Sequence, residues 1–166
     1  HARPSSIVHL AGARKLGHVT CLPGDIQAGF RFYTEVLGMG LSDWLGEAGV
    51  WFHVNTDHHV MALVDLGYAH FHHLAFETVD VGKMRDMLDH VARHGRWLSW
   101  GPTRHGITRG RTIYFFDPSG NRNEVFCGDY TWYPDREPIT WDTGELGKAI
   151  FYHDRKLNES FLNVVT

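Results

Sequence analysis

The stretch Thr103–Glu124, TRHGITRGRTIYFFDPSGNRNE, predicts a β-hairpin that carries chemically active side chains. Thr112–Phe116 is rich in β-branched and aromatic residues, Asp117–Gly120 has the Pro-then-Gly pattern of a turn, and Asn123–Cys127 resumes the strand pattern. Glu124 lies inside this second strand, where an unpaired buried carboxylate would cost several kcal/mol. We therefore expect Glu124 to face solvent, a basic partner or a metal.

Composition limits the classes of protein to which the chain can belong. Its 166 residues suffice for one core or two small modules, and the net charge of −3 with dispersed Lys and Arg argues against nucleic-acid binding. No run of apolar residues is long enough to span a membrane. Two cysteines, Cys21 and Cys127, without a CxxC motif favour a reducing, cytoplasmic setting. The unusual feature is 13 dispersed histidines, so their spacing must identify which of them are functional.

The order strand, helix and three strands is predicted twice along the chain, in modules of about 16–66 and 70–128. In the first module Asp25 is the expected helix N-cap and Gly38 the stop, and in the second Asp80 and Gly95 have these roles. The expected strands are 16–22, 41–45, 50–55 and 58–64 in the first module, and 71–76, 97–100, 112–116 and 123–127 in the second.

The predicted fold class is therefore α+β, with two βαβββ modules that curve a mixed sheet into a cup around a metal site. Residues 1–15, with the linker-like Arg3–Ser6, are expected to be a leader, and the chain to be the C-terminal part of a longer one. Residues 129–166 are expected to form a tail whose aromatic residues cover an apolar flank of the catalytic domain.

Two smaller expectations concern residues around this core. Asn121 and Arg122 are expected to satisfy backbone groups of the hairpin. The tryptophans are expected in the core, with some of them lining an apolar pocket for an aromatic ring; they are Trp44, Trp51, Trp97 and Trp100.

A 2-His-1-carboxylate set emerges from the repeat. His18 and His73 occupy matching places in the first strand of each module, and Glu124 lies in the last strand. Such a set binds one face of an octahedral metal and leaves adjacent positions open, as non-haem Fe(II) oxygenases require. A single strand histidine is more often an ordinary core or surface residue, so the joint placement carries the hypothesis.

These residues also carry a family resemblance. The pattern Thr103-x-His105, Ile113-Tyr114, Asp117-Pro118-x-Gly120 and Glu124 resembles the signature of the extradiol ring-cleaving dioxygenases of the vicinal oxygen chelate superfamily. The ending GKAIFYHDRKLNESF (147–161) is also similar to catechol 2,3-dioxygenases. Those enzymes carry two pairs of βαβββ modules, of which the second holds iron, and this chain resembles that second half.

The resemblance implies a role for each candidate residue. Fe(II) is expected on His18, His73 and Glu124, with His73 preferred to its neighbour His72, which is expected on the flank because adjacent strand residues face opposite sides. In the segment NTDHHVMAL (55–63) the catalytic base is expected to be His59, with His58 as the alternative.

The resemblance also implies that Tyr114 hydrogen-bonds the metal-bound substrate oxygen and that His105 contacts the same oxygen or Tyr114, although Tyr114 could instead be a packed core aromatic. The implied reaction is extradiol cleavage of a catechol by O2 to a product of the 2-hydroxymuconic semialdehyde type, in a homo-oligomer. Two alternatives stay open. One is a non-oxygenase metalloenzyme of the same fold with Mn(II), Ni(II) or Zn(II), and the other is a metal-free module that binds a small molecule.

Overall fold

The computed structural model describes residues 12–145, 150–151 and 159–163. They form β1 (Ala13–Leu22), α1 (Ile26–Arg31), the π-helix η2 (Phe32–Val36), β2 (Gly40–Leu45), β3 (Gly49–His53), β4 (Met61–Val64), β5 (His70–Thr78), α2 (Val81–Arg93), β6 (Leu98–His105), β7 (Arg111–Phe116), β8 (Arg122–Cys127), β9 (Ile139–Trp141), the 3-10 helix η3 (Thr143–Glu145), β10 (Ile150–Phe151) and α3 (Glu159–Asn163). The order βαβββ occurs twice, which confirms the predicted α+β fold of two modules. Among the helices in these ranges, none is long and apolar enough to cross a bilayer.

Both module helices begin at the predicted caps. The Asp25 carboxylate accepts hydrogen bonds from the backbone N–H groups of Gln27 and Ala28, each 2.9 Å long. Asp80 accepts one from the N–H of Lys83, also 2.9 Å. Each cap satisfies helix N–H groups that have no partner inside the helix, a contribution of about 1 kcal/mol.

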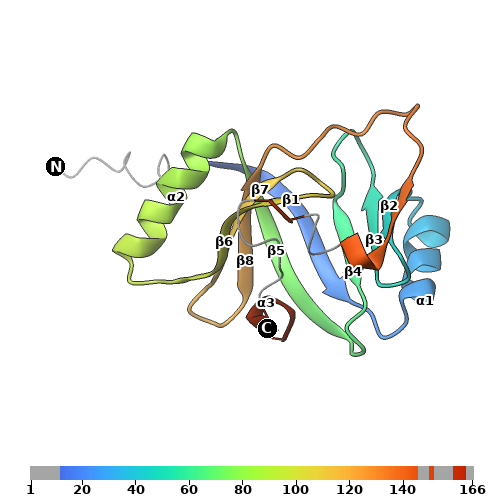
Figure 1. Ribbon diagram of the computed structural model, residues 1–166, viewed down its shortest axis with the longest axis horizontal. Helices are drawn as coiled ribbons and strands as arrows, with labels where there is room; N and C mark the ends of the chain where they lie inside the picture. The colour runs from blue at the N-terminus through green and yellow to red at the C-terminus, as the bar shows by residue number, and fades with distance from the viewer. Residues whose placement is uncertain (1–11, 146–149, 152–158, 164–166) are drawn as a thin grey trace.

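The strands form one ten-stranded mixed sheet in the order β10-β6-β7-β8-β5-β1-β4-β3-β2-β9. In each module the first strand runs parallel to the last, β1 with β4 and β5 with β8. The modules join through the antiparallel pair β1 and β5, which crosses the centre of the molecule with α1 and α2 at opposite ends (Figure 1). The two first strands are therefore neighbours, and residues far apart in sequence meet along this seam.

Each module has its own apolar core on the face of the sheet that its helix covers. Alternate residues of a strand point to opposite faces, so one face of each strand can serve the core and the other can serve a site. Val125 of β8 is in a core, for example, while Glu124 faces the other way. The buried core residues are Ile26, Val50, Phe52, Met61 and Leu63 in the first module, and Met84, Met87, Val91, Ile113 and Val125 in the second.

Three predicted strand limits differ from the structure by three residues or more. β1 begins at Ala13, so residues 13–15, expected in the leader, belong to a strand that pairs with β5. The strand expected at 58–64 begins only at Met61, and before it the side chain of Asn55 accepts a hydrogen bond from the N–H of Asp57 in a bend of the chain. β6 runs to residue 105 rather than ending at Trp100.

The tryptophan prediction was partly wrong. Trp97 is 87% exposed, because it precedes β6 and packs against neither core. Trp100 is buried as expected, and Trp51 lines the cavity described below.

The described parts of the tail pack on both edges of the sheet. β9 adds to β2 in parallel, and β10 adds to β6. Trp132 is buried and stacks on His53 with ring centroids 4.4 Å apart. Residues 1–11 of the expected leader, and most of the family-like ending at 147–161, lie outside the described residues.

Candidate metal centre

Strand pairing places His18, Ala75 and Glu124 in one row across β1, β5 and β8. Ala75 is the register partner of His18 on one side and of Glu124 on the other. Directly paired residues share a face of the sheet, and His73, two residues before Ala75, shares it too. Because Ala75 carries only a methyl group, the three larger side chains can converge above it.

The three predicted ligands do meet at one point. Nε2 of His18 and Nε2 of His73 each lie 3.0 Å from Oε2 of Glu124, and the two nitrogens are 3.4 Å apart. All three side chains are buried. Burial alone raises the pKa of Glu124, but attraction by His18 and hydrogen bonds from His105, His18 and His73 together hold this pKa well below its usual range. The carboxylate is therefore ionised at neutral pH.

This donor set fits a divalent cation. Two imidazole nitrogens and a carboxylate oxygen lie within 4.8 Å of one another, and they are donors that first-row transition metals accept. Thr112 donates a hydrogen bond of 2.5 Å to Oε1 of Glu124, which orients the carboxylate and leaves Oε2 on the histidine side. Among the described residues, the ion pairs of Glu124 involve histidines only.

A cavity of about 150 Å³ adjoins these three side chains. Apolar residues of the first module form much of one wall, including Leu45, Trp51 and Val64, while Ile107 and Phe161 come from the second module and the tail. An engineered cavity of about this size binds benzene. All six predicted site residues line the cavity: His18, His59, His73, His105, Tyr114 and Glu124.

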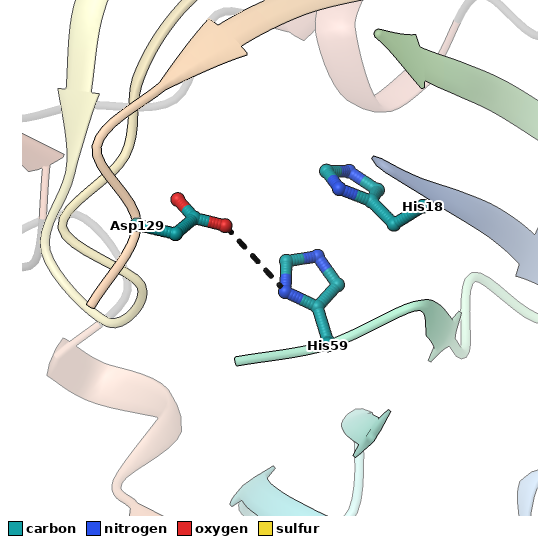
Figure 2. Close-up of side chains that lie close together, drawn as sticks. All are labelled: His18, His59 and Asp129. Carbon is teal, nitrogen blue, oxygen red and sulfur yellow. Dashed lines mark ion pairs between the residues drawn. The ribbon is translucent and has the colours of Figure 1, made fainter. Parts of the chain in front are cut away.

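His59 lies just before β4 and is buried against the metal donors. Its ring centroid is 4.1 Å from that of His18, and Nδ1 lies 3.8 Å from Oδ2 of Asp129 (Figure 2). Burial, with repulsion from His18 and His58, lowers the pKa of His59 well below its ordinary value. The ring is therefore neutral near pH 7. His58, the alternative, is fully buried beside Asp43 and does not line the cavity.

His105 and Tyr114 form a contact at the other side of the cavity. Nε2 of His105, the last residue of β6, lies 2.8 Å from the hydroxyl of Tyr114. Tyr114 is the register partner of Glu124, so its ring points to the site face rather than into the helix-covered core. Burial and the charge of Glu124 raise the pKa of Tyr114 well above its ordinary value, so the phenol keeps its proton.

Two expectations about the surroundings were wrong. His72 is not a flank residue: it is buried, lines the cavity, and its Nδ1 lies 2.6 Å from Nδ1 of His73. The reason is an irregularity in the pairing of β5, where Thr20 pairs with His73 and Cys21 with Phe71, so His72 has no register partner on β1.

Arg122 does not serve the hairpin backbone as expected. It is fully buried, and its Nη1 donates to Nε2 of His72 over 2.8 Å. The guanidinium also lies 5.0 Å from the ring centroid of Phe116 and 5.2 Å from that of Phe161. Asn121 remains at the turn and bonds Asp117.

The sequence reasoning missed three residues of the site. Asp129 follows the last strand of the second module, and burial together with the charge of Glu124 raises its pKa to about 7. Phe161 comes from the tail and packs on Trp100 with ring centroids 4.4 Å apart. Thr112 alternates with Tyr114 on one face of β7, a period-2 signal that could have identified it.

Comparisons with known proteins agree with this arrangement. The chain is 42% identical to a metapyrocatechase from Pseudomonas sp. (strain CF600), over 95% of this chain and 54% of that protein. It is similar to the crystal structure of homoprotocatechuate 2,3-dioxygenase from Arthrobacter globiformis, with 26% identity and a TM-score of 0.82 over 94% of this chain and 51% of that one. It is also similar to a Mn(II)-bound glyoxalase from Novosphingobium aromaticivorans, with 26% identity and a TM-score of 0.76 over 80% of this chain and 44% of that one.

The chain spans about half the length of these relatives. A family model matches residues 15–125, which include both modules almost completely and all six predicted site residues. The chain therefore belongs to the Glyoxalase/Bleomycin resistance protein/Dioxygenase superfamily.

Proposed function

We propose that this chain carries the metal site of an extradiol dioxygenase that cleaves a catechol with O2. The observation that carries the proposal is the convergence of two histidines and one buried glutamate on a cavity that also contains His59, His105 and Tyr114. In the proposed reaction both atoms of O2 enter the product, and the ring bond between one hydroxyl-bearing carbon and its neighbour without a hydroxyl group breaks. Catechol and O2 together supply every atom of the 2-hydroxymuconic semialdehyde, so no further co-reactant is needed.

Fe(II) is the proposed cofactor, held by His18, His73 and Glu124. When bound there, it supplies open coordination positions at which the two catechol oxygens and O2 can be brought together. The similarity to a Mn(II)-bound glyoxalase makes Mn(II) the second candidate metal.

His59 is the proposed general base. Because its ring is neutral near pH 7, it can accept the proton of a catechol hydroxyl and later return it to the substrate as the ring opens. The ring lies beside the metal donors, as its centroid distance of 4.1 Å from His18 shows.

Tyr114 and His105 are proposed to orient the substrate. Tyr114 keeps its proton and can donate a hydrogen bond to a catechol oxygen, while His105 holds the Tyr114 hydroxyl through the 2.8 Å contact. Leu45, Trp51 and Ile107 give the cavity an apolar lining that suits an aromatic ring and excludes water.

The direct test is anaerobic reconstitution with Fe(II), followed by addition of catechol and air. We expect O2 uptake equal to the catechol consumed and a yellow ring-opened product. Glu124→Ala should lose both metal and turnover, whereas Glu47→Ala, at an exposed glutamate of the first module, should retain both. Metal binding without any O2 uptake would contradict the oxygenase assignment.

Two alternatives make different predictions in the same experiment. A non-oxygenase metalloenzyme, suggested by the glyoxalase similarity, would bind metal but would have no use for His59, His105 and Tyr114 as a set. A metal-free binding module would hold no metal at all, and the buried pairing of Glu124 with two histidines argues against it.

The setting of the protein is part of the proposal. Cys21 and Cys127 are both free thiols, which supports a reducing, cytoplasmic location. The homo-oligomer stays a prediction, which light scattering on the purified protein would test.

A further inference from the structure

A buried chain of side chains leads from strand β2 to the wall of the cavity. Oδ2 of Asp43 lies 3.1 Å from Nε2 of His58, and Nδ1 of His58 lies 3.0 Å from Nδ1 of His59. Asp43 and His58 are fully buried, and neither has a role in the function proposed above. The positions of their hydrogens can be deduced from their partners.

Asp43 acts only as a hydrogen-bond acceptor. Burial raises its pKa, but hydrogen bonds from His58, from the backbone of Ile139 and from Trp141 outweigh burial, so the pKa lies below its ordinary value. Arg136 adds a salt bridge of 3.0 Å to Oδ1, and the hydroxyl of Tyr130 lies 3.1 Å from Oδ2. An ionised carboxylate that faces only donors must accept at both oxygens.

The proton positions along the two imidazoles follow in order. Because Asp43 accepts, Nε2 of His58 carries the hydrogen of that bond. Burial lowers the pKa of His58 despite the attraction of Asp43, so the ring is neutral and its Nδ1 has a lone pair. Nδ1 of His59 must therefore donate to it, and an uncharged His59 ring then has its lone pair on Nε2.

The Asp129 carboxyl group lies on the same side of the ring. Its Oδ2 is 3.8 Å from Nδ1 of His59, along the dashed line in Figure 2. That distance is too long for a hydrogen bond, so the contacts with His58 and Asp43 decide which ring nitrogen carries the hydrogen.

We propose that Asp43 and His58 are positioning residues that hold His59 in the tautomer with its hydrogen on Nδ1 and its lone pair on Nε2. The proposal rests on the function above, in which His59 accepts the substrate proton. In this tautomer Nε2 can take that proton directly, whereas the other tautomer would present an N–H group there. Once His59 is cationic, its Nδ1–H still bonds His58, and the Asp43 carboxylate stabilises the positive charge through that ring.

The first test reads the tautomer directly, without any turnover. Long-range ¹H–¹⁵N NMR spectra of histidine-labelled protein, loaded with diamagnetic Zn(II), distinguish a protonated from an unprotonated ring nitrogen. His59→Phe assigns the His59 signals among the 13 histidines. We expect a hydrogen on Nδ1 of His59 and none on Nε2, and the reverse pattern would overturn the proposal.

Asp43→Asn tests the origin of this tautomer. Donors surround both oxygens of Asp43, and Asn offers one acceptor oxygen in place of two and no negative charge. Nε2 of His58 is then held less firmly as a donor, and we expect the His59 signals to shift toward the other tautomer. An unchanged His59 spectrum in the folded variant would overturn the role of Asp43.

A second pair of variants keeps the test valid if Asp43→Asn does not fold. His58→Asn and His58→Leu have similar shapes, but only Asn has an oxygen able to accept from Nδ1 of His59. With Fe(II) bound, we expect His58→Leu to lower kcat at least tenfold with little change in KM or metal content, and His58→Asn to recover most of that loss. Equal kcat values in the two variants would overturn the proposal. Absence of ring cleavage in the unmodified protein would contradict the proposed function but would leave the NMR result readable.

Discussion

The site contains two pairs of adjacent histidines, one in each module, and they are built alike. Nδ1 of His58 contacts Nδ1 of His59 over 3.0 Å, and Nδ1 of His72 contacts Nδ1 of His73 over 2.6 Å. In each pair the second histidine lies beside the metal donors or is one of them, and the first is buried behind it. The pairs arise at unrelated places in the modules, one before β4 and one inside β5.

The tail places an aromatic ring on the first histidine of each pair. Tyr130 packs on His58 with ring centroids 4.6 Å apart, and Phe161 packs on His72 with centroids 5.3 Å apart. The tail is thus part of the support for both halves of the site.

The pairs differ in the charge of the buried residue that contacts Nε2 of the first histidine. Asp43 accepts from Nε2 of His58, whereas Arg122 donates to Nε2 of His72. Glu124 is ionised, so Nε2 of His73 donates to it, and the neutral ring of His73 accepts at Nδ1 from Nδ1 of His72. Nε2 of His72 then has the lone pair that accepts from Arg122, although the backbone oxygen of Phe161 also lies 3.2 Å from this nitrogen. The same dipeptide therefore takes opposite tautomers, because Asp43 accepts the hydrogen at the end of the first pair and Glu124 accepts it at the end of the second. A cation that binds Nε2 of His73 must displace a proton from it.

The same substitution in each pair should have different consequences, and this is the largest effect that we expect. His73→Phe removes a metal donor and should lose metal and activity together. His59→Phe should keep the metal while turnover falls by about 10²–10⁴-fold, the usual contribution of a general base. Metal content by atomic absorption, together with O2 uptake, separates the two outcomes, and loss of metal from His59→Phe would remove the functional distinction between the pairs.

Arg122→Met should make the two histidine pairs more alike, because it removes the positive charge that contacts His72. Without the guanidinium donor, His73 can carry its hydrogen on Nδ1 and offer a lone pair at Nε2, and a nearby positive charge is also removed. We expect Zn(II) affinity at pH 7 to rise by about tenfold, since each factor of ten corresponds to 1.4 kcal/mol, and fewer protons to be released on binding. Calorimetry in buffers of different ionisation enthalpy measures both quantities. Arg31→Met, at an exposed position, is the control, and unchanged proton release in Arg122→Met would contradict the tautomer assigned to His73.

Asp129→Asn tests the raised pKa of the carboxyl group that lies beside Nδ1 of His59. Burial raises the pKa of Asp129 from 3.8 to about 7, so the folded protein favours the protonated acid. Its stabilising contribution is complete below pH 3.8 and is lost as pH rises through about 7.

In metal-free protein, the free energy of unfolding of Asp129→Asn should therefore increase relative to that of the unmodified chain between pH 5 and pH 8. We expect a change of about 1–3 kcal/mol, less than a fully buried group would give, because a shift of one pKa unit corresponds to 1.36 kcal/mol. Urea unfolding at both pH values measures it, and a constant difference between the two proteins would contradict the raised pKa.

Tyr130→Phe should have the smallest effect. It keeps the ring on His58 but removes one hydrogen bond to Asp43, which retains its bonds to Arg136 and Ile139. The free energy of unfolding should fall by about 1 kcal/mol or less, and the tautomer of His59 should not change. A reversed tautomer in the NMR spectrum would show that the hydroxyl, rather than the carboxylate, controls the first pair.

Local sequence signals were sufficient for the modules and for the three side chains that meet at the candidate metal centre. The caps Asp25 and Asp80 and the strand pattern act over a few residues, so they could be recognised without a structure. The matched placement of His18 and His73 followed from the repeat, because equivalent strands of two modules meet along one seam.

Features that depend on irregular pairing or on distant segments could not be recognised in this way. A strict alternation along β5 predicts that His72 and His73 face opposite sides, and only the irregular pairing with β1 brings both to the cavity. The sequence predicted Arg122 to be a residue of the hairpin turn. In the structure it is buried beneath two aromatic rings, one of which belongs to the tail.

By itself, the sequence determined the two-module α+β fold and the residue types of the candidate metal site, since periodicity and capping are properties of short segments. Tertiary structure alone decided which charge lies behind each histidine pair. Asp43 and Arg122 are 15 and 50 residues away from the histidines that they contact. Only the folded sheet brings these charges within hydrogen-bonding distance of the imidazole rings, where a charge can act on the proton of its neighbour.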